Sequence, residues 1–142
     1  MKDGDAFEFV VLGVPRGFLA RTWGRRKPKK DSEKKRVARY LTFRDNVVIA
    51  SRQARCMTPL KASKDLICIV ETKAFFNTGN FPDPENVHKG LVDALFYGTE
   101  GAGDRWCGGW FAPPLFDKKN PRVEVLVEWF SMKRYRKEVL DV

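Results

Sequence analysis

The chain has 142 residues, 43% of them hydrophobic, and its 27 Lys and Arg against 18 Asp and Glu give a formal net charge of +9. This length suits one domain whose core needs no disulfide or metal, and the composition is ordinary for a soluble globular protein. The excess of cations favours an anionic partner. Nucleic acid is favoured over a membrane because no long apolar or amphipathic anchor is found.

The start of the chain and its cysteines are typical of a cytoplasmic protein. Residues 1–5 are polar, without the apolar region of a secretory signal, and no window approaches the roughly 18 apolar residues that span a bilayer. Cys56, Cys68 and Cys107 are odd in number and far apart, and with a single histidine they match no zinc pattern. We therefore expect reduced, mostly buried thiols.

In chain order, the first half of the sequence predicts a strand, a basic loop and a helix. The alternation in residues 7–12 predicts a strand, which Pro15 follows. Residues 16–31 form the basic loop, and a helix begins at Asp31 or Ser32, either of which can cap it. Its buried side is predicted from apolar residues at spacings of three and four, namely Val37, Tyr40, Phe43, Val47, Ala50 and Ala54.

The second half predicts two more strands, a helix and a long loop. Residues 66–70 are nearly all apolar, which is typical of a central strand. A helix is predicted from Pro84 to Tyr97, because proline suits a first helical turn and apolar residues recur with helical spacing. Residues 99–121 are predicted to be a loop rich in Gly and aromatic residues, and residues 123–129 alternate as a last strand. This order predicts an α+β fold in which a small mixed sheet carries two main helices on one face.

A tight group of charges lies at the start of the second predicted helix. Asp83 precedes the helix and Glu85 lies in its first turn, where the helix dipole favours anions. Glu85, Lys89 and Asp93 follow at spacings of four, so they lie along one face. Carboxylates repel a DNA phosphate unless a divalent cation lies between them, so this group in a basic protein indicates a metal-dependent nuclease. The alternative is a capped helix with a surface ladder of salt bridges.

An Asp, a second acid, an Asn, a Lys and an Asp-Ala-Leu follow one another without a gap as Asp83, Glu85, Asn86, Lys89 and Asp93-Ala94-Leu95. This order and spacing resemble the signature of RusA-type Holliday-junction resolvases. The likeness extends to a strand followed by proline at residues 12–15, to Phe-Arg-Asp-Asn at residues 43–46 and to the closing strand at residues 122–129. It therefore covers nearly the whole chain.

The resemblance implies a metal-dependent, structure-selective DNA endonuclease that resolves Holliday junctions by paired phosphodiester hydrolysis in recombination and repair. It also implies a RusA-like fold, a homodimer, and the cytoplasm of a bacterium or of a phage-infected host. The family's third essential Asp, in the loop after the helix, corresponds to Asp104, with Glu100 and Asp117 as alternatives.

On this resemblance, Asp83, Glu85 and Asp104 would bind Mg²⁺, for which Mn²⁺ could substitute, and Lys89 would stabilise the reacting phosphate or orient the water. Asn86 and Asp93 would support these groups, Asp93 as a partner of Lys89. His88 lies about 100° from Lys89 around the helix, so we expect it to serve in packing rather than as a base.

Basic residues near both ends of the chain indicate where branched DNA, and four-way junctions in particular, would bind. The predicted DNA contacts are Arg16, Arg21, Arg25, Arg26, Lys27, Lys29, Lys30, Lys133 and Arg134. A four-way junction has two-fold symmetry, which a homodimer with two matching active sites would fit. The alternative function is a non-catalytic DNA-binding or recombination accessory protein whose acids are structural.

Overall fold

The computed structural model describes residues 1–19, 30–97 and 104–141, and of Asp104 only the backbone. It is an α+β fold with a mixed sheet and three helices. The elements in chain order are β1 (Ala6–Leu12), α1 (Asp31–Ala54), β2 (Leu66–Phe76), α2 (Pro84–Leu95), η2 (Asp104–Trp106), β3 (Cys107–Phe111), β4 (Leu115–Phe116), β5 (Arg122–Ser131), α3 (Met132–Tyr135) and η3 (Arg136–Leu140).

The sheet has β5 and β2 at its centre. Its order is β1-β5-β2-β3, and β4 pairs with the last two residues of β2. β5 runs antiparallel to both β1 and β2, whereas β3 and β4 run parallel to β2. The parallel pairs follow from the crossover through α2, which carries the chain back to the end of the sheet where β2 began.

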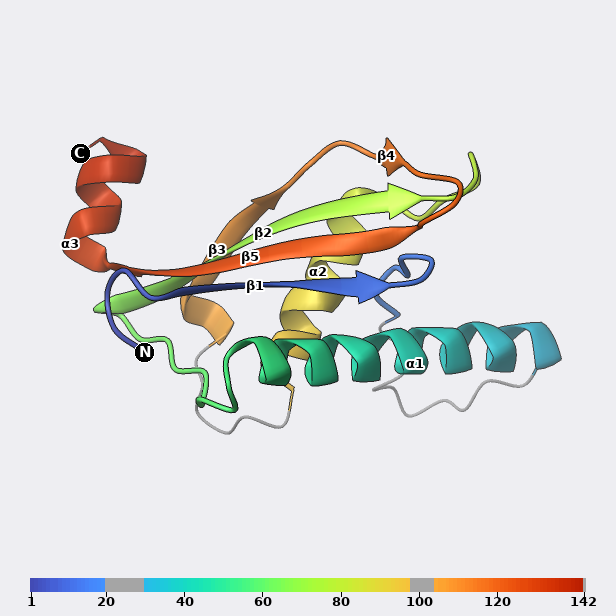
Figure 1. Ribbon diagram of the computed structural model, residues 1–142, viewed down its shortest axis with the longest axis horizontal. Helices are drawn as coiled ribbons and strands as arrows, with labels where there is room; N and C mark the ends of the chain where they lie inside the picture. Colours follow the sequence, from blue (N-terminus) through green and yellow to red (C-terminus); the bar gives the residue numbers. More distant parts are fainter. Residues whose placement is uncertain (20–29, 98–103, 142) are drawn as a thin grey trace.

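Both long helices lie on one side of the sheet, and α3 lies at one end of it (Figure 1). Alternation along β5 decides which residues meet the helices: Val123, Val125 and Val127 are buried, while Leu126 between them is 40% exposed on the opposite face. The prediction of an α+β fold with a mixed sheet and two main helices on one face is therefore confirmed.

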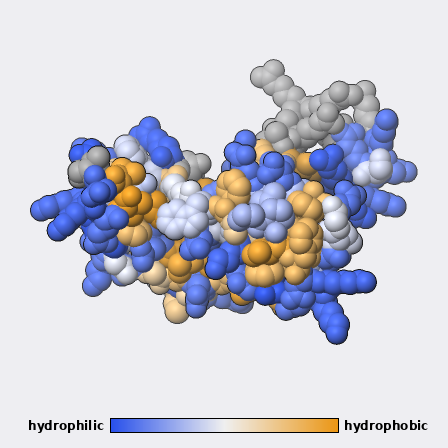
Figure 2. Space-filling model, turned by 90° about the horizontal axis from the view of Figure 1, so that it is seen from above, coloured by the Kyte–Doolittle hydropathy of each residue, from blue (hydrophilic) through white to orange (hydrophobic). Residues whose placement is uncertain are grey.

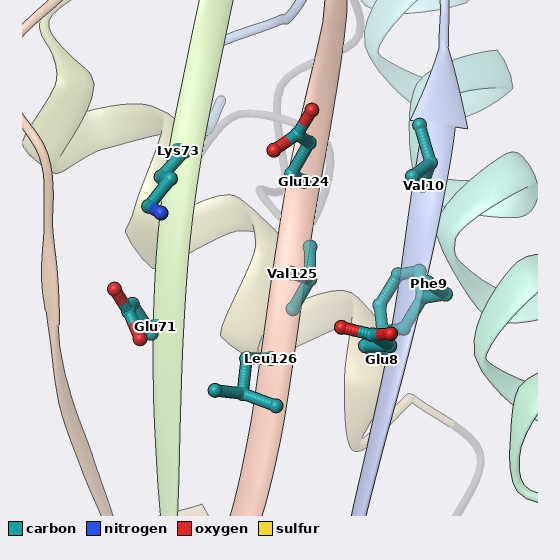
Figure 3. Close-up of a pocket in the computed structure, with 8 residues that line it drawn as sticks. All are labelled: Glu8, Phe9, Val10, Glu71, Lys73, Glu124, Val125 and Leu126. Atoms are coloured by element: carbon teal, nitrogen blue, oxygen red, sulfur yellow. The ribbon is translucent and has the colours of Figure 1, made fainter.

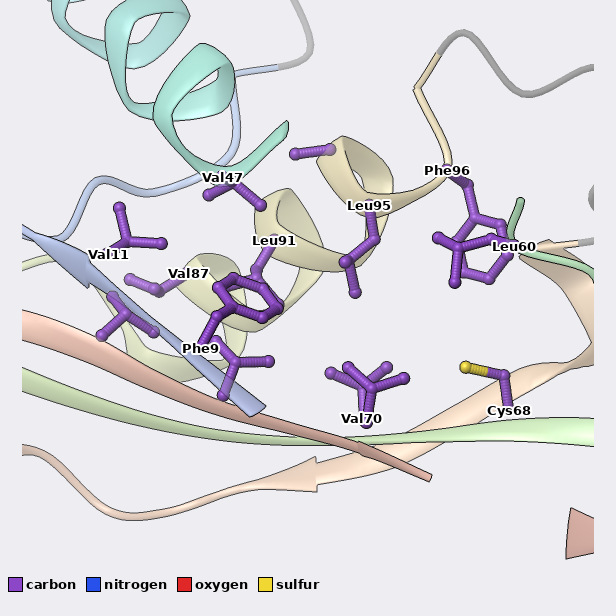
Figure 4. Close-up of a cluster of buried hydrophobic side chains, with 14 of the residues drawn as sticks. Phe9, Val11, Val47, Leu60, Cys68, Val70, Val87, Leu91, Leu95 and Phe96 are labelled. Carbon is purple, nitrogen blue, oxygen red and sulfur yellow. The ribbon is translucent and has the colours of Figure 1, made fainter. Parts of the chain in front are cut away.

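The core lies between the sheet and these two helices. Figure 4 shows Val87, Leu91 and Leu95 of α2 above Val70 and Cys68 of β2, with Val87 at one end of the group and Cys68 at the other. Because Val87 precedes Leu95, α2 runs antiparallel to β2. Each fully buried Leu or Val stabilises the fold by about 1.5–3 kcal/mol relative to an exposed one.

Several boundaries differ from the prediction. The helix predicted to reach Tyr97 ends at Leu95, and β2 continues six residues beyond Val70, to Phe76. On α1, Ala50 and Ala54 are partly buried and pack against the core as expected. Ser51, which was not expected there, is also buried, and its hydroxyl donates to the Val48 carbonyl at 3.0 Å.

The prediction that residues 99–121 are a loop is wrong over part of that range. η2, β3 and β4 lie within it, and β3 pairs with β2 from Cys68–Cys107 to Thr72–Phe111. The two consecutive glycines of β3 hid the strand, because Gly is depleted in strands. Gly109 has φ +151°, and a Cβ there would overlap the Val70 carbonyl oxygen, so the close approach of β3 to β2 needs a glycine.

The prediction of mostly buried thiols holds for only one cysteine. Cys68 is buried, Cys107 is partly buried and Cys56 is exposed. Cys56 follows the C-cap of α1 with φ 52°, at a turn that takes the chain away from the helix. None of the helices in the described ranges is long and apolar enough to cross a bilayer.

Candidate nucleic-acid and metal site

Asp83 is the N-cap of α2. Its Oδ1 accepts a hydrogen bond from the Glu85 N–H at 2.9 Å, and its carbonyl accepts those of Asn86 and Val87. Pro84 follows at the first helical position, where its missing N–H costs nothing. Asp83 and Glu85 are both exposed, so Oδ2 of Asp83 and the Glu85 carboxylate can face an ion or a ligand from solvent.

Asn86 ties the segment after β1 to this helix. Its backbone carbonyl accepts the Phe18 N–H at 3.1 Å, and its Nδ2 donates to the Phe18 carbonyl at 3.2 Å. Gly90, one turn further along α2, lets the Phe18 backbone approach, since a Cβ there would be 3.3 Å from the Phe18 Cα. The segment that carries Arg16 is therefore fixed beside the acidic helix start.

Lys89 and Asp93 extend the same face of α2. The Lys89 ammonium lies 4.8 Å from the centroid of the Phe18 ring, a cation–π contact. Asp93 is half-buried. The pKa of Tyr40 is raised to about 12, first by the burial of Tyr40 and then by the negative charge of Asp93. Asp93 therefore faces the interface between α1 and α2.

A cleft of about 200 Å³ adjoins the start of α2. Three arginines line it: Arg16 from the segment after β1, and Arg36 and Arg39 from α1. Its other lining residues with polar groups are Tyr40, Asn77, Asn80 and Asn86.

The electrostatics of this cleft favour an anion. Burial, and then the charge of Arg39, lower the pKa of Arg16. A guanidinium that is partly desolvated next to a like charge is stabilised when an anion enters between the two. The cleft therefore suits a phosphate group, at the end of α2 where Asp83 and Glu85 lie.

η2 lies at the opposite end of α2 from this cleft. Its last residue, Trp106, precedes Cys107, which pairs with Cys68 near the start of β2, whereas Asp83 follows the end of β2. The axis of α2 between Asp83 and Leu95 spans about 18 Å at 1.5 Å per residue. The backbone of η2 is thus on the side of Leu95, and the Asp104 side chain lies outside what the structure describes.

Of the two alternatives for the third acid, the structure describes only Asp117. Glu100 lies outside the described residues. The Asp117 N–H bonds the Phe76 carbonyl at 2.9 Å, which places it at the same end of β2 as Asp83. Its carboxylate, however, accepts from Arg122 at 2.9 Å and from the Asn120 N–H at 3.1 Å, and these bonds lower its pKa. Among the side chains that the structure describes, no three of His, Cys, Asp or Glu gather to hold a metal.

The predicted DNA contacts fall into three groups. Arg16 lines the cleft, and Lys30 is exposed at the N-cap of α1. Lys133 is exposed on α3, and α3 follows β5 beside the start of β2, at the opposite end of the sheet from the cleft. The predicted contacts outside the described residues are Arg21, Arg25, Arg26, Lys27 and Lys29.

Arg134 holds the two ends of the domain together. Its guanidinium donates to Asp3 at 2.7 Å, to Glu138 at 3.2 Å and to the Trp129 carbonyl at 2.9 Å, and it stacks 3.9 Å from the Phe130 ring centroid. The hydrogen bond with Asp3, and after it the one with Glu138, raise the pKa of Arg134. These contacts give Arg134 a structural role.

Arg36 and Arg39 are the site residues that the sequence prediction omitted. Both lie off the apolar stripe of α1, at a spacing of three that puts them on one face. That spacing was visible in the sequence, whereas the meeting of both residues with Arg16 across the cleft was not.

An open hollow lies on the other face of the sheet. It measures about 380 Å³ and contains Glu8, Glu71 and Glu124 with a single cation, Lys73 (Figure 3). Apolar side chains such as Leu126 and Val10 are exposed among them, and Figure 2 shows apolar atoms between hydrophilic ones on this side. Three carboxylates against one ammonium make this hollow unfavourable for a polyanion.

His88 packs as expected. Its Nδ1 is 2.8 Å from Oγ1 of the buried Thr72, and its ring centroid is 5.8 Å from that of Phe111. Burial lowers its pKa, against a smaller opposing effect of Glu85.

No model of a known protein family matches the chain, and no curated protein shows significant similarity to it.

Proposed function

We propose that the protein is a metal-dependent DNA endonuclease that cuts branched DNA, with four-way junctions as its main substrate. The observation that carries this proposal is the cleft of Arg16, Arg36 and Arg39 at the start of α2, the helix end where Asp83 and Glu85 are exposed. The arginines would bind a DNA phosphate, and the carboxylates would face the neighbouring scissile phosphate.

The acid pair fits Mg²⁺ by the chemistry of its donors. Mg²⁺ keeps several waters and is commonly bound through one or two carboxylates plus substrate phosphates, so Asp83 and Glu85 suffice as protein ligands. The bound ion would polarise the phosphate and lower the pKa of a coordinated water. Lys89 would meet phosphate charge. Asp104, the third ligand that the family resemblance implies, would have to reach this pair from the Leu95 side of α2.

Paired cutting of a junction would require two copies. A homodimer of RusA-like subunits would present two acid pairs related by the two-fold axis of the junction. This dimer, the role in recombination and repair, and the substitution of Mn²⁺ for Mg²⁺ belong to the same proposal.

The placement of η2 favours a second candidate, a DNA-binding or recombination accessory protein without catalysis. The η2 backbone lies on the Leu95 side of α2, and Asp83 already serves as a helix cap. Under this reading the arginine cleft binds junction phosphates, and the acids only shape the helix start.

The test compares wild-type protein with Asp83→Asn on a synthetic four-way junction with and without Mg²⁺. Asn is as good an N-cap as Asp, so the variant keeps the helix start and removes only the charge. We expect symmetric nicks from the wild type with Mg²⁺, and for the variant unchanged junction binding with at least about a 100-fold loss of cleavage, the scale at which enzymes lose a key electrostatic group.

Glu8→Gln is the matched control, because it removes one exposed carboxylate from the acidic hollow on the opposite face. It should cut like the wild type. Wild-type protein that binds the junction and never nicks it with Mg²⁺ or Mn²⁺ would establish the accessory function instead.

A further inference from the structure

Cys68 and Cys107 face each other on neighbouring strands. They are direct Cα partners in the parallel register of β2 and β3, so their side chains project from the same face of the sheet. Paired residues on neighbouring strands are about 5 Å apart, within the range of about 4.4–6.8 Å that a disulfide needs between Cα atoms.

Packing brings the two thiols together. Cys68 is fully buried in the main core, and Cys107 packs against the same core at its edge. A hydrogen bond between the two thiols, followed by burial, raises the pKa of Cys68. The tight approach of β3 to β2 at Gly109, two residues further on, holds this pair of strands close.

We propose that Cys68 and Cys107 form a dithiol site that small-molecule disulfides oxidise to a disulfide between β2 and β3. This inference is independent of the proposed nuclease activity. The partly exposed Cys107 is the point of entry, and the buried Cys68 resolves the intermediate.

The reaction is two successive thiol–disulfide exchanges. The Cys107 thiolate attacks a disulfide RSSR, forms a Cys107–S–S–R bond and releases one RS⁻. The Cys68 thiol attacks Cys107 Sγ, its proton passes to the departing sulfur, and the second RSH is released. Two electrons pass from the protein thiols to the reagent, which is reduced from one disulfide to two thiols.

The bond would fix the first residue of β3 to the central strand. η2, which ends at Trp106 immediately before Cys107, would then be held at the start of β2.

The experiment uses the full chain with Cys56→Ser, because the exposed Cys56 would otherwise react by itself. The reduced, native protein is incubated with glutathione disulfide, and its mass and tryptic peptides are measured. We expect a product lighter by two hydrogens, with one peptide pair joined through Cys68 and Cys107, and complete loss of both titratable thiols.

The Cys56→Ser/Cys68→Ser variant should stop at a stable glutathione adduct on Cys107. Because Cys68 is buried, that variant could fail to fold, and the peptide map of Cys56→Ser alone then decides. A Cys56→Ser protein that retains both thiols, accumulates the glutathione adduct without closure, or links only between molecules overturns the proposal.

Discussion

Asp83 combines two roles that a single substitution can separate. As the N-cap it satisfies the Glu85 N–H, and as an exposed charge it would face a metal and DNA. Asp83→Ala should lower the free energy of unfolding by about 1 kcal/mol, because it leaves that N–H without its side-chain partner, whereas Asp83→Asn should lower it far less.

Urea unfolding of the three proteins, followed by circular dichroism, measures this difference. Equal losses of stability for Ala and Asn would contradict the capping role and assign the effect to charge alone.

His88 should make stability depend on pH below neutrality. Its folded-state pKa lies below the ordinary value, because burial beside Thr72 and Phe111 disfavours the charged ring. The unfolded chain therefore takes up the proton more readily, and stability present above the unfolded-state pKa of about 6.5 is lost as the pH falls through and below that value.

We expect the free energy of unfolding of wild-type protein to fall more steeply than that of His88→Gln between about pH 7.5 and about pH 5. The two proteins are compared by urea unfolding at each pH, so that acid groups common to both cancel. Parallel curves would show that His88 titrates alike in the folded and unfolded states.

At the scale of elements, α2 fixes both the core and the candidate site. Leu91 is fully buried in the middle of the helix, and Asn86 and Lys89 on its exposed side hold the Phe18 segment. Leu91→Ala should cost about 2–5 kcal/mol of unfolding free energy, because it removes buried methyl groups and leaves a cavity.

Ile49→Ala on α1 is the matched control, since Ile49 is also a large aliphatic residue on a helix but is 55% exposed. Its cost should stay within about 0.5 kcal/mol. Chemical unfolding measures the free energy of unfolding of both variants. Similar losses would show that Leu91 contributes no more to the stability of the core than an exposed residue does.

Hydrophobic periodicity predicted the helices and strands that bury a regular stripe of side chains. It missed the strands that pair with a neighbouring strand but bury no such stripe. The alternation from Val123 to Trp129 and the helical spacing of Val87, Leu91 and Leu95 gave β5 and α2 directly. β3 was not predicted because Gly108 and Gly109 lie within it, and Gly is depleted in strands. It is a strand because it pairs with β2, not because of the propensity of its residues.

The candidate site was predictable where its residues are local in sequence and not where they converge from afar. Asp83, Glu85 and Asn86 come from one helix start, so spacing alone placed them together. The position of η2 depends on the register of β3 against β2, and the cleft needs Arg16 to meet Arg39 across two segments. Neither relation leaves a local pattern in the chain.

At the scale of the whole molecule, charge is divided between the two sides of the sheet. The net charge is +9, yet the open face carries Glu8, Glu71 and Glu124, whereas the arginine cleft lies on the helix side. DNA should therefore approach from the helix side, with the acidic face turned away from it.

Arg39→Ala and Lys73→Ala test this division, because each removes one positive charge and only Arg39 lines the cleft. Binding of a four-way junction, measured by fluorescence anisotropy over a range of salt concentrations without a divalent ion, gives the slope of log affinity against log salt. Arg39→Ala should make that slope shallower by about 0.9, the value for one lost phosphate contact. Lys73→Ala should leave the slope unchanged, since a cation on the far face displaces no counterion from the bound DNA. Equal losses of affinity in both variants would show that net charge rather than the cleft governs binding, and that DNA does not prefer the helix side.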